Sequence, residues 1–273
     1  MYMKLKDGKG KVLTLSYDDG VVQDIRLMDI MNKHGLKGTF NIGSGKYLPE
    51  DTVREKYYGR MKLSEAKELY IGSGHEVALH AFTHPHLEKM NSPEIVQEIW
   101  EDRKHIEKTY GAIARGMAYP FGAYNETVKD VLRNCGVVYA RTTRSTYKFD
   151  FPTDWLELHP TCRHKDTRLM ELADKFLASN AANSARMFYL WGHSYEFDDM
   201  DNWNVIEAFA EKMGGREDIW YATNIEVYDY VKAYEQLQVS ADRTVIHNPT
   251  ATDVWAFDRG ETFCIKAGET LHR

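Results

Sequence analysis

The sequence predicts an α/β protein, a distorted (β/α)7–8 barrel followed by a small C-terminal antiparallel β extension. Apolar strand-like runs alternate with helix-like segments over residues 12–237, and repeated strand–helix units imply a parallel sheet. About eight such units favour a closed or nearly closed barrel, which takes about 250 residues, over a doubly wound sheet. The 273 residues, 43% hydrophobic and 12% aromatic, can also build a sizeable core.

Each expected strand is a short apolar run that ends at a turn or at a helix start. Strands are expected at residues 12–17, 39–42, 76–79, 116–119, 137–140, 156–158, 187–190 and 220–222. Each expected helix begins near a capping residue, for example Ser64, Ser92 before Pro93, or Asn125. Helices are expected at residues 22–34, 64–72, 92–110, 125–135, 167–178, 202–213 and 225–237.

The pattern changes at residue 238. Short β-like runs at 239–247, 253–257 and 262–266 alternate with turn sequences such as Asn248-Pro249 and Arg259-Gly260. We therefore divide the chain into a barrel of residues 1–237 and a β extension of residues 238–273 packed on it. The expected role of this sheet is to cover the barrel, and carbohydrate binding is the alternative.

Composition narrows the class of protein. The net charge of −6 and the pI near 6.0 argue against nucleic-acid or anionic-membrane partners, which require a basic surface. No apolar run approaches the ~20 residues of a membrane span, and the first residues contain no apolar segment of signal-peptide length. A cytoplasmic location is therefore expected, with a secreted chain trimmed of its signal as the alternative.

Two histidines follow the strand expected at 76–79. His80 and His84 are four residues apart, a helical spacing that puts two imidazoles on one side of the backbone, about 5–6 Å apart at Cβ. A metal that must also hold reactants needs a third ligand, commonly a carboxylate. Asp18 and Asp19, directly after the strand at 12–17, are the obvious donors, because loops after the strands of a barrel share one rim.

Four ordered motifs resemble the polysaccharide deacetylase family, carbohydrate esterase family four, with its nodulation-type deacetylase homology domain. The resemblance spans roughly residues 10 to 230. The motifs are Tyr17-Asp18-Asp19-Gly20, His80 to His84, Tyr119-Pro120-Phe121-Gly122 and Leu190-Trp191-Gly192-His193.

The resemblance implies a role for each motif. Asp19, His80 and His84 would hold one divalent transition metal, Asp18 would be the general base, and His193 the general acid. The turn of Tyr119, Pro120 and Phe121 would supply the Phe121 amide to the oxyanion. Asp154, Trp155 and Trp191 would bind the sugar, the two tryptophans through the faces of their rings.

The sequence departs from the family pattern at two positions. Val21 replaces a proline after the acidic turn, and Ala118 replaces the arginine that orients the base. Arg115, Arg141 or Arg163 could substitute for that arginine from another direction, and the sequence leaves the choice open.

The implied function is a metal-dependent hydrolase that removes N-acetyl groups from an N-acetylated sugar, oligosaccharide or polysaccharide. Zinc is the first expectation for the metal, with cobalt, nickel or iron as alternatives. Two other functions stay open: a hydrolase of a non-sugar amide or imide at the same site, and a catalytically weak carbohydrate-binding protein. The sugar, its chain length and the oligomeric state are not determined by the sequence.

Overall fold

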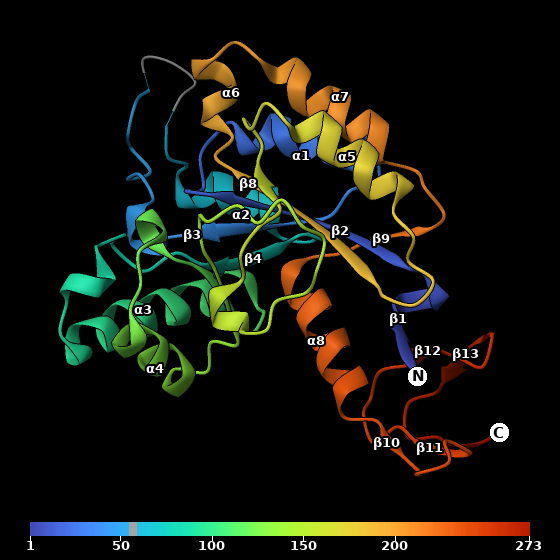
Figure 1. Ribbon diagram of the computed structural model, residues 1–273. Helices are drawn as coiled ribbons and strands as arrows, with labels where there is room; N and C mark the ends of the chain where they lie inside the picture. The colour runs from blue at the N-terminus through green and yellow to red at the C-terminus, as the bar shows by residue number, and fades with distance from the viewer. Residues whose placement is uncertain (55–58) are drawn as a thin grey trace.

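A curled parallel sheet forms the centre of the molecule (Figure 1). The computed structural model describes residues 1–54 and 59–273. The strands lie in the order β6-β5-β4-β3-β2-β8-β7, and β9 also pairs with β2. Their bounds are β2 Lys11–Asp18, β3 Gly38–Ile42, β4 Glu76–Leu79, β5 Gly116–Ala118, β6 Tyr139–Arg141, β7 Cys162–Arg163, β8 Arg186–Gly192 and β9 Ile219–Tyr221.

Strand β2 is the central strand, and all eight of its residues are buried. Strand β8 pairs with β2 in parallel from Lys11 to Tyr17, while β9 and β3 share the opposite edge. The segment between β6 and β7 narrows the remaining gap, because Leu158 bridges to Arg141 of β6 and Cys162 pairs with Leu190 of β8. The expected distorted (β/α) barrel is therefore confirmed as a curled, incompletely closed sheet.

The strand expected at residues 156–158 is reduced to a single parallel bridge between Leu158 and Arg141. Residues 155–157 form a 3-10 turn, η5 (Trp155–Glu157), because the Asp154 side chain accepts a hydrogen bond from the Leu156 amide and caps the turn. The strand of this region is β7, which lies a few residues later.

Helices cover the sheet on both sides, with α1, α5 and α7 gathered on one side and α3 and α4 on the other (Figure 1). No helix in the described ranges is long and apolar enough to cross a membrane. The bounds are α1 Asp24–Lys33, α2 Leu63–Tyr70, α3 Ser92–Tyr110, α4 Glu126–Asn134, α5 Leu169–Ala178, α6 Tyr195–Asp199, α7 Trp203–Met213 and α8 Asn224–Glu235.

Two of the expected N-terminal capping residues are wrong, and one is confirmed. Asn125 caps α4 as expected, accepting a hydrogen bond from the Val128 amide. Helix α3 is capped by Asn91 rather than Ser92, and α2 begins after Lys62 rather than at Ser64. The short helix α6 was not expected, because five residues carry too little apolar periodicity to predict a helix.

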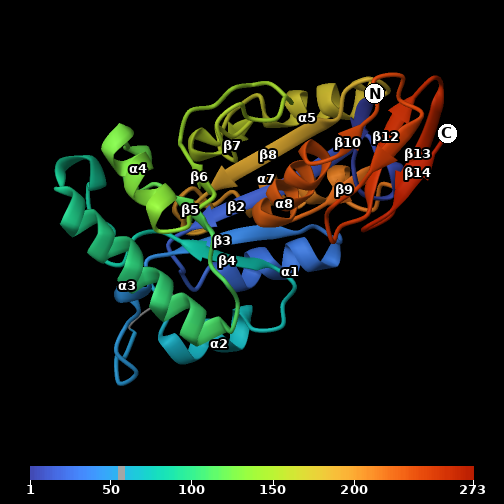
Figure 2. The same cartoon turned by 90° about the horizontal axis from the view of Figure 1, so that it is seen from below.

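The C-terminal strands form two three-stranded antiparallel sheets, where one was expected (Figures 1 and 2). Strand β1 (Tyr2–Lys4) completes the first with β12 (Val254–Asp258) and β13 (Glu261–Ile265). The second contains β10 (Gln238–Val239), β11 (Val245–His247) and β14 (Thr270–His272). The Tyr230 hydroxyl on α8 joins the first sheet to the barrel: it donates to the Lys4 carbonyl and accepts from the Trp255 amide.

Candidate active site

Polar side chains from three strands meet at one end of the barrel. Asp18 ends β2, His80 directly follows β4, and His193 directly follows β8. Because parallel strands present their carboxyl ends at the same rim, residues far apart in sequence become neighbours. The Nε2 atom of His80 lies 3.9 Å from Asp18 Oδ2, and that of His193 lies 3.8 Å from the same oxygen.

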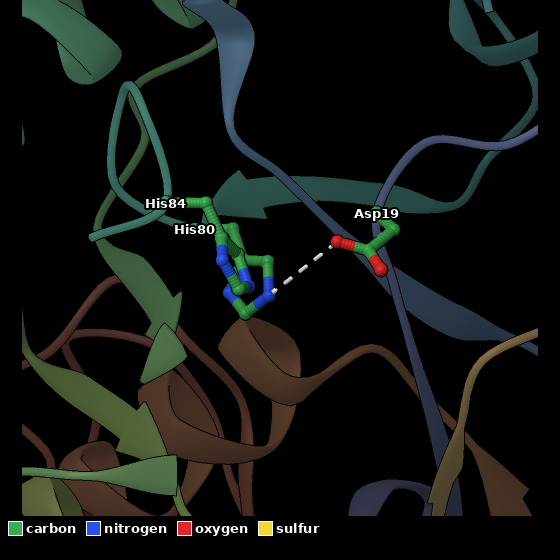
Figure 3. Close-up of side chains that lie close together, drawn as sticks. All are labelled: Asp19, His80 and His84. Atoms are coloured by element: carbon green, nitrogen blue, oxygen red, sulfur yellow. Dashed lines mark ion pairs between the residues drawn. The ribbon is translucent and has the colours of Figure 1, made fainter. Parts of the chain in front are cut away.

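Asp19, His80 and His84 form the cluster that could hold a metal ion (Figure 3). One ligand atom from each residue lies within 4.8 Å of the others. The Nδ1 atom of His80 is 2.8 Å from the Ala118 carbonyl oxygen, which can only accept. Nδ1 therefore carries the proton, and the lone pair of Nε2 points to the side of Asp19, whose Oδ1 is 3.9 Å away (Figure 3).

Both imidazoles of the cluster are uncharged at neutral pH. Burial lowers the pKa of His80, although the carboxylates of Asp18 and Asp19 oppose this. Burial, with the neighbouring His80, lowers the pKa of His84 to about 4. Neutral rings keep their lone pairs for a metal, because protonation and ligation compete for the same nitrogen.

Asp19 completes the donor set. Its Oδ1 atom is buried and has no hydrogen-bond partner within residues 1–54 and 59–273. Arg60 Nη2 lies 2.7 Å from Oδ1 as an ion pair, without the alignment of a hydrogen bond. Two imidazole nitrogens and one carboxylate oxygen with unused capacity fit a divalent transition metal.

The backbone around this cluster adopts conformations that non-glycine residues rarely occupy. Asp19, Ala81, His84 and Phe121 have φ values of 89°, 59°, 60° and 59°. Such residues persist where the surrounding structure holds them, and they concentrate at functional sites. The left-handed turn at Phe121 brings its ring against His84, with ring centroids 4.6 Å apart.

Asp18 is a buried carboxylate beside a buried guanidinium. Its side chain accepts a 2.9 Å hydrogen bond from Asn41 Nδ2 and a short one from Arg141 Nη2. Burial would raise the pKa of Asp18, but Arg141, His80, His193 and the Asn41 bond outweigh burial and lower it. Asp18 is therefore ionised at neutral pH and able to accept a proton.

Of the three arginines that the sequence left open, Arg141 is the one whose guanidinium contacts Asp18. It pairs in register with Ala118 on the adjacent strand, so the guanidinium reaches Asp18 from the level of the missing arginine. Arg115 instead forms a 2.6 Å ion pair with Asp229, and Arg163 lies 2.6 Å from Glu196. Spacing in the sequence could not decide between them, because the choice depends on which strand lies next to β5.

Two charged groups lie beside Nδ1 of His193, the ring nitrogen opposite the one near Asp18. Arg163 Nη2 lies 3.1 Å and Glu196 Oε2 lies 3.5 Å from His193 Nδ1. Burial would raise the pKa of Glu196, but His164, His193 and Arg163 outweigh it and lower the pKa. Glu196 was not predicted from the sequence. Its position three residues after His193 is the feature of the sequence that could have indicated the contact. Arg60 was also missed, because it lies on a connection that is distant in sequence from both Asp19 and His80.

The turn expected to supply the oxyanion contact lies beside the cluster. Pro120 and Phe121 belong to the 3-10 turn η4 (Pro120–Gly122), and Phe121 is 57% exposed. Tyr119 is buried, stacks on Tyr124 and donates from its hydroxyl to the Leu156 carbonyl. The Tyr119 side chain thus supports the turn from the core.

Three residues expected to bind sugar have other contacts. Asp154 caps η5 and forms a 2.8 Å ion pair with Lys129, and Trp155 is buried against Tyr228. Trp191 is 4% exposed. The expectation of open stacking faces at Trp155 and Trp191 is corrected, because both rings are enclosed by protein.

A family sequence profile and two curated relatives match part of the chain. The sequence profile described as polysaccharide deacetylase matches residues 5–140. Chitin deacetylase 1 of Cryptococcus neoformans is 26% identical over 146 residues, 52% of this chain and 28% of its own length. Peptidoglycan-N-acetylglucosamine deacetylase of Listeria monocytogenes is 25% identical over 122 residues, 44% of this chain and 23% of its own length. The chain thus spans about a quarter of the length of these relatives.

Solved structures share the fold. A family 4 carbohydrate esterase from Streptomyces lividans, in complex with acetate, has a TM-score of 0.51 and 16% identity, covering 77% of this chain and 91% of that chain. A CE4 family pseudoenzyme from Bacillus anthracis has a TM-score of 0.50 and 16% identity, covering 83% of this chain and 67% of that chain. At these identities the likeness shows the fold alone.

Proposed function

We propose, since this chain belongs to the polysaccharide deacetylase family, that it is a metal-dependent hydrolase removing N-acetyl groups from an N-acetylated sugar, oligosaccharide or polysaccharide. The deacetylases that it resembles are named for chitin and for peptidoglycan N-acetylglucosamine, which supports this substrate class. The metal would be divalent, with zinc first and cobalt, nickel or iron as alternatives.

The observation that carries the proposal is the position of Asp18 between the metal-ligand cluster and His193. One carboxylate oxygen lies 3.9 Å from His80 Nε2 and 3.8 Å from His193 Nε2. A candidate base and a candidate acid therefore lie close together beside three possible ligand atoms, an arrangement that suits metal-assisted amide hydrolysis.

Asp19, His80 and His84 would hold the metal, which would supply Lewis-acid chemistry to an acetyl carbonyl and to the attacking water. Asp18 accepts a proton from the attacking water, while Asn41 and Arg141 keep its carboxylate in place.

The later steps use the other two motifs. The Phe121 amide stabilises the charge that develops on the carbonyl oxygen. His193 donates a proton to the departing nitrogen as the C–N bond breaks, so that acetate and an amine leave.

The test is acetate release from N-acetylglucosamine oligomers of increasing length, compared with hydrolysis of cyclic amides and imides. Asp18→Asn is the matched inactive control, because it keeps the shape of the side chain and removes the basic oxygen. Acetate release that depends on added zinc and on Asp18 is the expected result. Hydrolysis of the cyclic compounds alone would move the substrate to a non-sugar amide, and sugar binding without release would indicate a catalytically weak binding protein.

A further inference from the structure

The buried ring of Trp191 lies against two guanidinium groups. The Cζ atom of Arg141 is 4.3 Å and that of Arg163 is 4.9 Å from the centroid of the Trp191 ring. Arg163 pairs in register with Trp191 across β7 and β8, whereas Arg141 comes from β6 at the other edge of the sheet. The ring therefore joins the two edges of the incompletely closed barrel.

The two arginines contact different candidate catalytic residues: Arg141 contacts the base Asp18, and Arg163 contacts the acid His193. Arg141 donates to the Asp18 carboxylate. Arg163 donates to Glu196 Oε1 at 2.6 Å and lies 3.1 Å from His193 Nδ1. A change in the ring would be transmitted to the base through one arginine and to the acid through the other.

Hydrogen bonds alone do not hold these guanidinium groups in place. The Nε atoms of Arg141 and Arg163 are buried and have no hydrogen-bond partner in the part of the chain that the structure describes. Besides its bond to Asp18, the Arg141 side chain donates a 3.3 Å hydrogen bond to the Thr142 carbonyl. The face of an indole attracts a planar cation most strongly among aromatic rings, so the stack takes over part of the orienting role.

We propose that Trp191 is a positioning residue of the deacetylation reaction, and that the Arg141–Trp191–Arg163 stack sets the base Asp18 and the acid His193 relative to each other. This inference rests on the proposed function. It gives Trp191 a role without contact to the sugar, which agrees with its 4% exposure.

The kinetic test compares Trp191→Leu with Trp191→Phe. Loss of the aromatic face should lower kcat for an N-acetylglucosamine oligomer on the order of 10- to 100-fold. KM should change by less than about twofold, because the ring does not bind substrate. Phenylalanine retains a ring and should restore most of the activity. Metal content should stay at the wild-type value in both variants.

Trp203→Leu is the matched control for a buried tryptophan. Trp203 is 7% exposed and stacks on Arg26 at 4.4 Å, but that arginine pairs with Glu207 on the surface. Its loss removes a buried ring and also the 2.7 Å hydrogen bond from Trp203 Nε1 to Asp198, so Trp203→Leu should destabilise the fold at least as much as Trp191→Leu, without the fall in kcat. An equal fall in kcat in both leucine variants, or a rise in KM alone at Trp191, would overturn the positioning role.

A readout without substrate separates this inference from the proposed function. In metal-free, ¹⁵N-labelled protein, the Arg141 and Arg163 Nε–H signals, assigned with Arg141→Lys and Arg163→Lys, should both shift in Trp191→Leu. Trp203→Leu should leave them in place. Unshifted signals in Trp191→Leu would refute the stack even in an active enzyme, whereas shifted signals in a protein that releases no acetate would refute only the proposed reaction.

Discussion

Replacement of Arg141 by methionine should disable Asp18 while leaving the metal ligands in place. The Arg141 side chain is fully buried and Asp18 is 2% exposed, so water cannot substitute for the lost guanidinium. Methionine fills much of the same space without a charge. The variant therefore isolates the electrostatic contribution of Arg141 to the base.

The magnitude follows from the burial of the pair. Removing one partner of a buried ion pair typically costs about 3–5 kcal/mol of unfolding free energy, because the other charge is left uncompensated. Asp18 can relieve part of this cost by binding a proton, since burial by itself raises the pKa of Asp18. We expect its pKa to move from below to above the ordinary carboxyl range, and kcat/KM at neutral pH to fall by roughly 10²–10⁴-fold.

The pH dependence of stability should change sign. In the wild type the lowered pKa of Asp18 contributes stability above the ordinary carboxyl pKa of about 3.9, and this stability is lost as the pH falls through the folded-state pKa. In Arg141→Met the raised pKa should make stability decline as the pH rises above about 4.

The assays are urea unfolding between pH 4 and 8 and kcat/KM across the same range. Arg115→Met is the matched control, because its pair with Asp229 leaves the two side chains 34% and 46% exposed. A pair of this kind contributes about 0–1 kcal/mol. If Arg141→Met keeps the wild-type acid limb and loses no more stability than Arg115→Met, then Arg141 does not keep Asp18 ionised.

Three further predictions concern the ligands, the acid and a buried carboxylate. His80→Ala and Asp19→Ala should lose the single metal, whereas Asp18→Asn should keep it; elemental analysis measures this, and equal losses at Asp18 and Asp19 would mean that their roles are misassigned. His193→Ala should lower kcat/KM for N-acetyl substrates far more than for an aryl acetate ester, whose phenolate leaves unprotonated; equal losses would exclude a general acid. Burial raises the pKa of Asp24 to about 7, so its contribution to stability is complete below about pH 4 and is lost towards pH 7. Asp24→Asn should flatten that part of the urea-unfolding profile, and an unchanged slope would contradict the assignment.

Much of the fold could be predicted because apolar periodicity is a local property. The run at 76–79 became β4 with the expected bounds, and Asn125 caps α4 as its side chain predicts. The predictions failed where local preference was weak or ambiguous. Of the strand expected at 156–158, the first two residues became part of a 3-10 turn, because the preceding Asp154 caps a turn more effectively than three residues form a strand.

The same distinction applies to the candidate site. Asp18, Asp19, His80, His84 and His193 could be placed on one rim from sequence, since strand–helix alternation predicts parallel strands and parallel strands share their ends. The functions of these residues in catalysis remain predictions for the experiments above.

By itself, the sequence determined the barrel and the set of polar residues at its rim. Strand–helix alternation and residue type can both be read from short stretches of sequence. The tertiary structure alone decided that Arg141 and not Arg115 or Arg163 reaches Asp18, and that Trp191 faces two guanidinium groups. These contacts depend on strand register and on how far the sheet curls, which are set by packing across the whole core. The buried Asp18 of β2 takes its partner from β6, which does not pair with β2 in the sheet, and distance along the chain does not identify that strand.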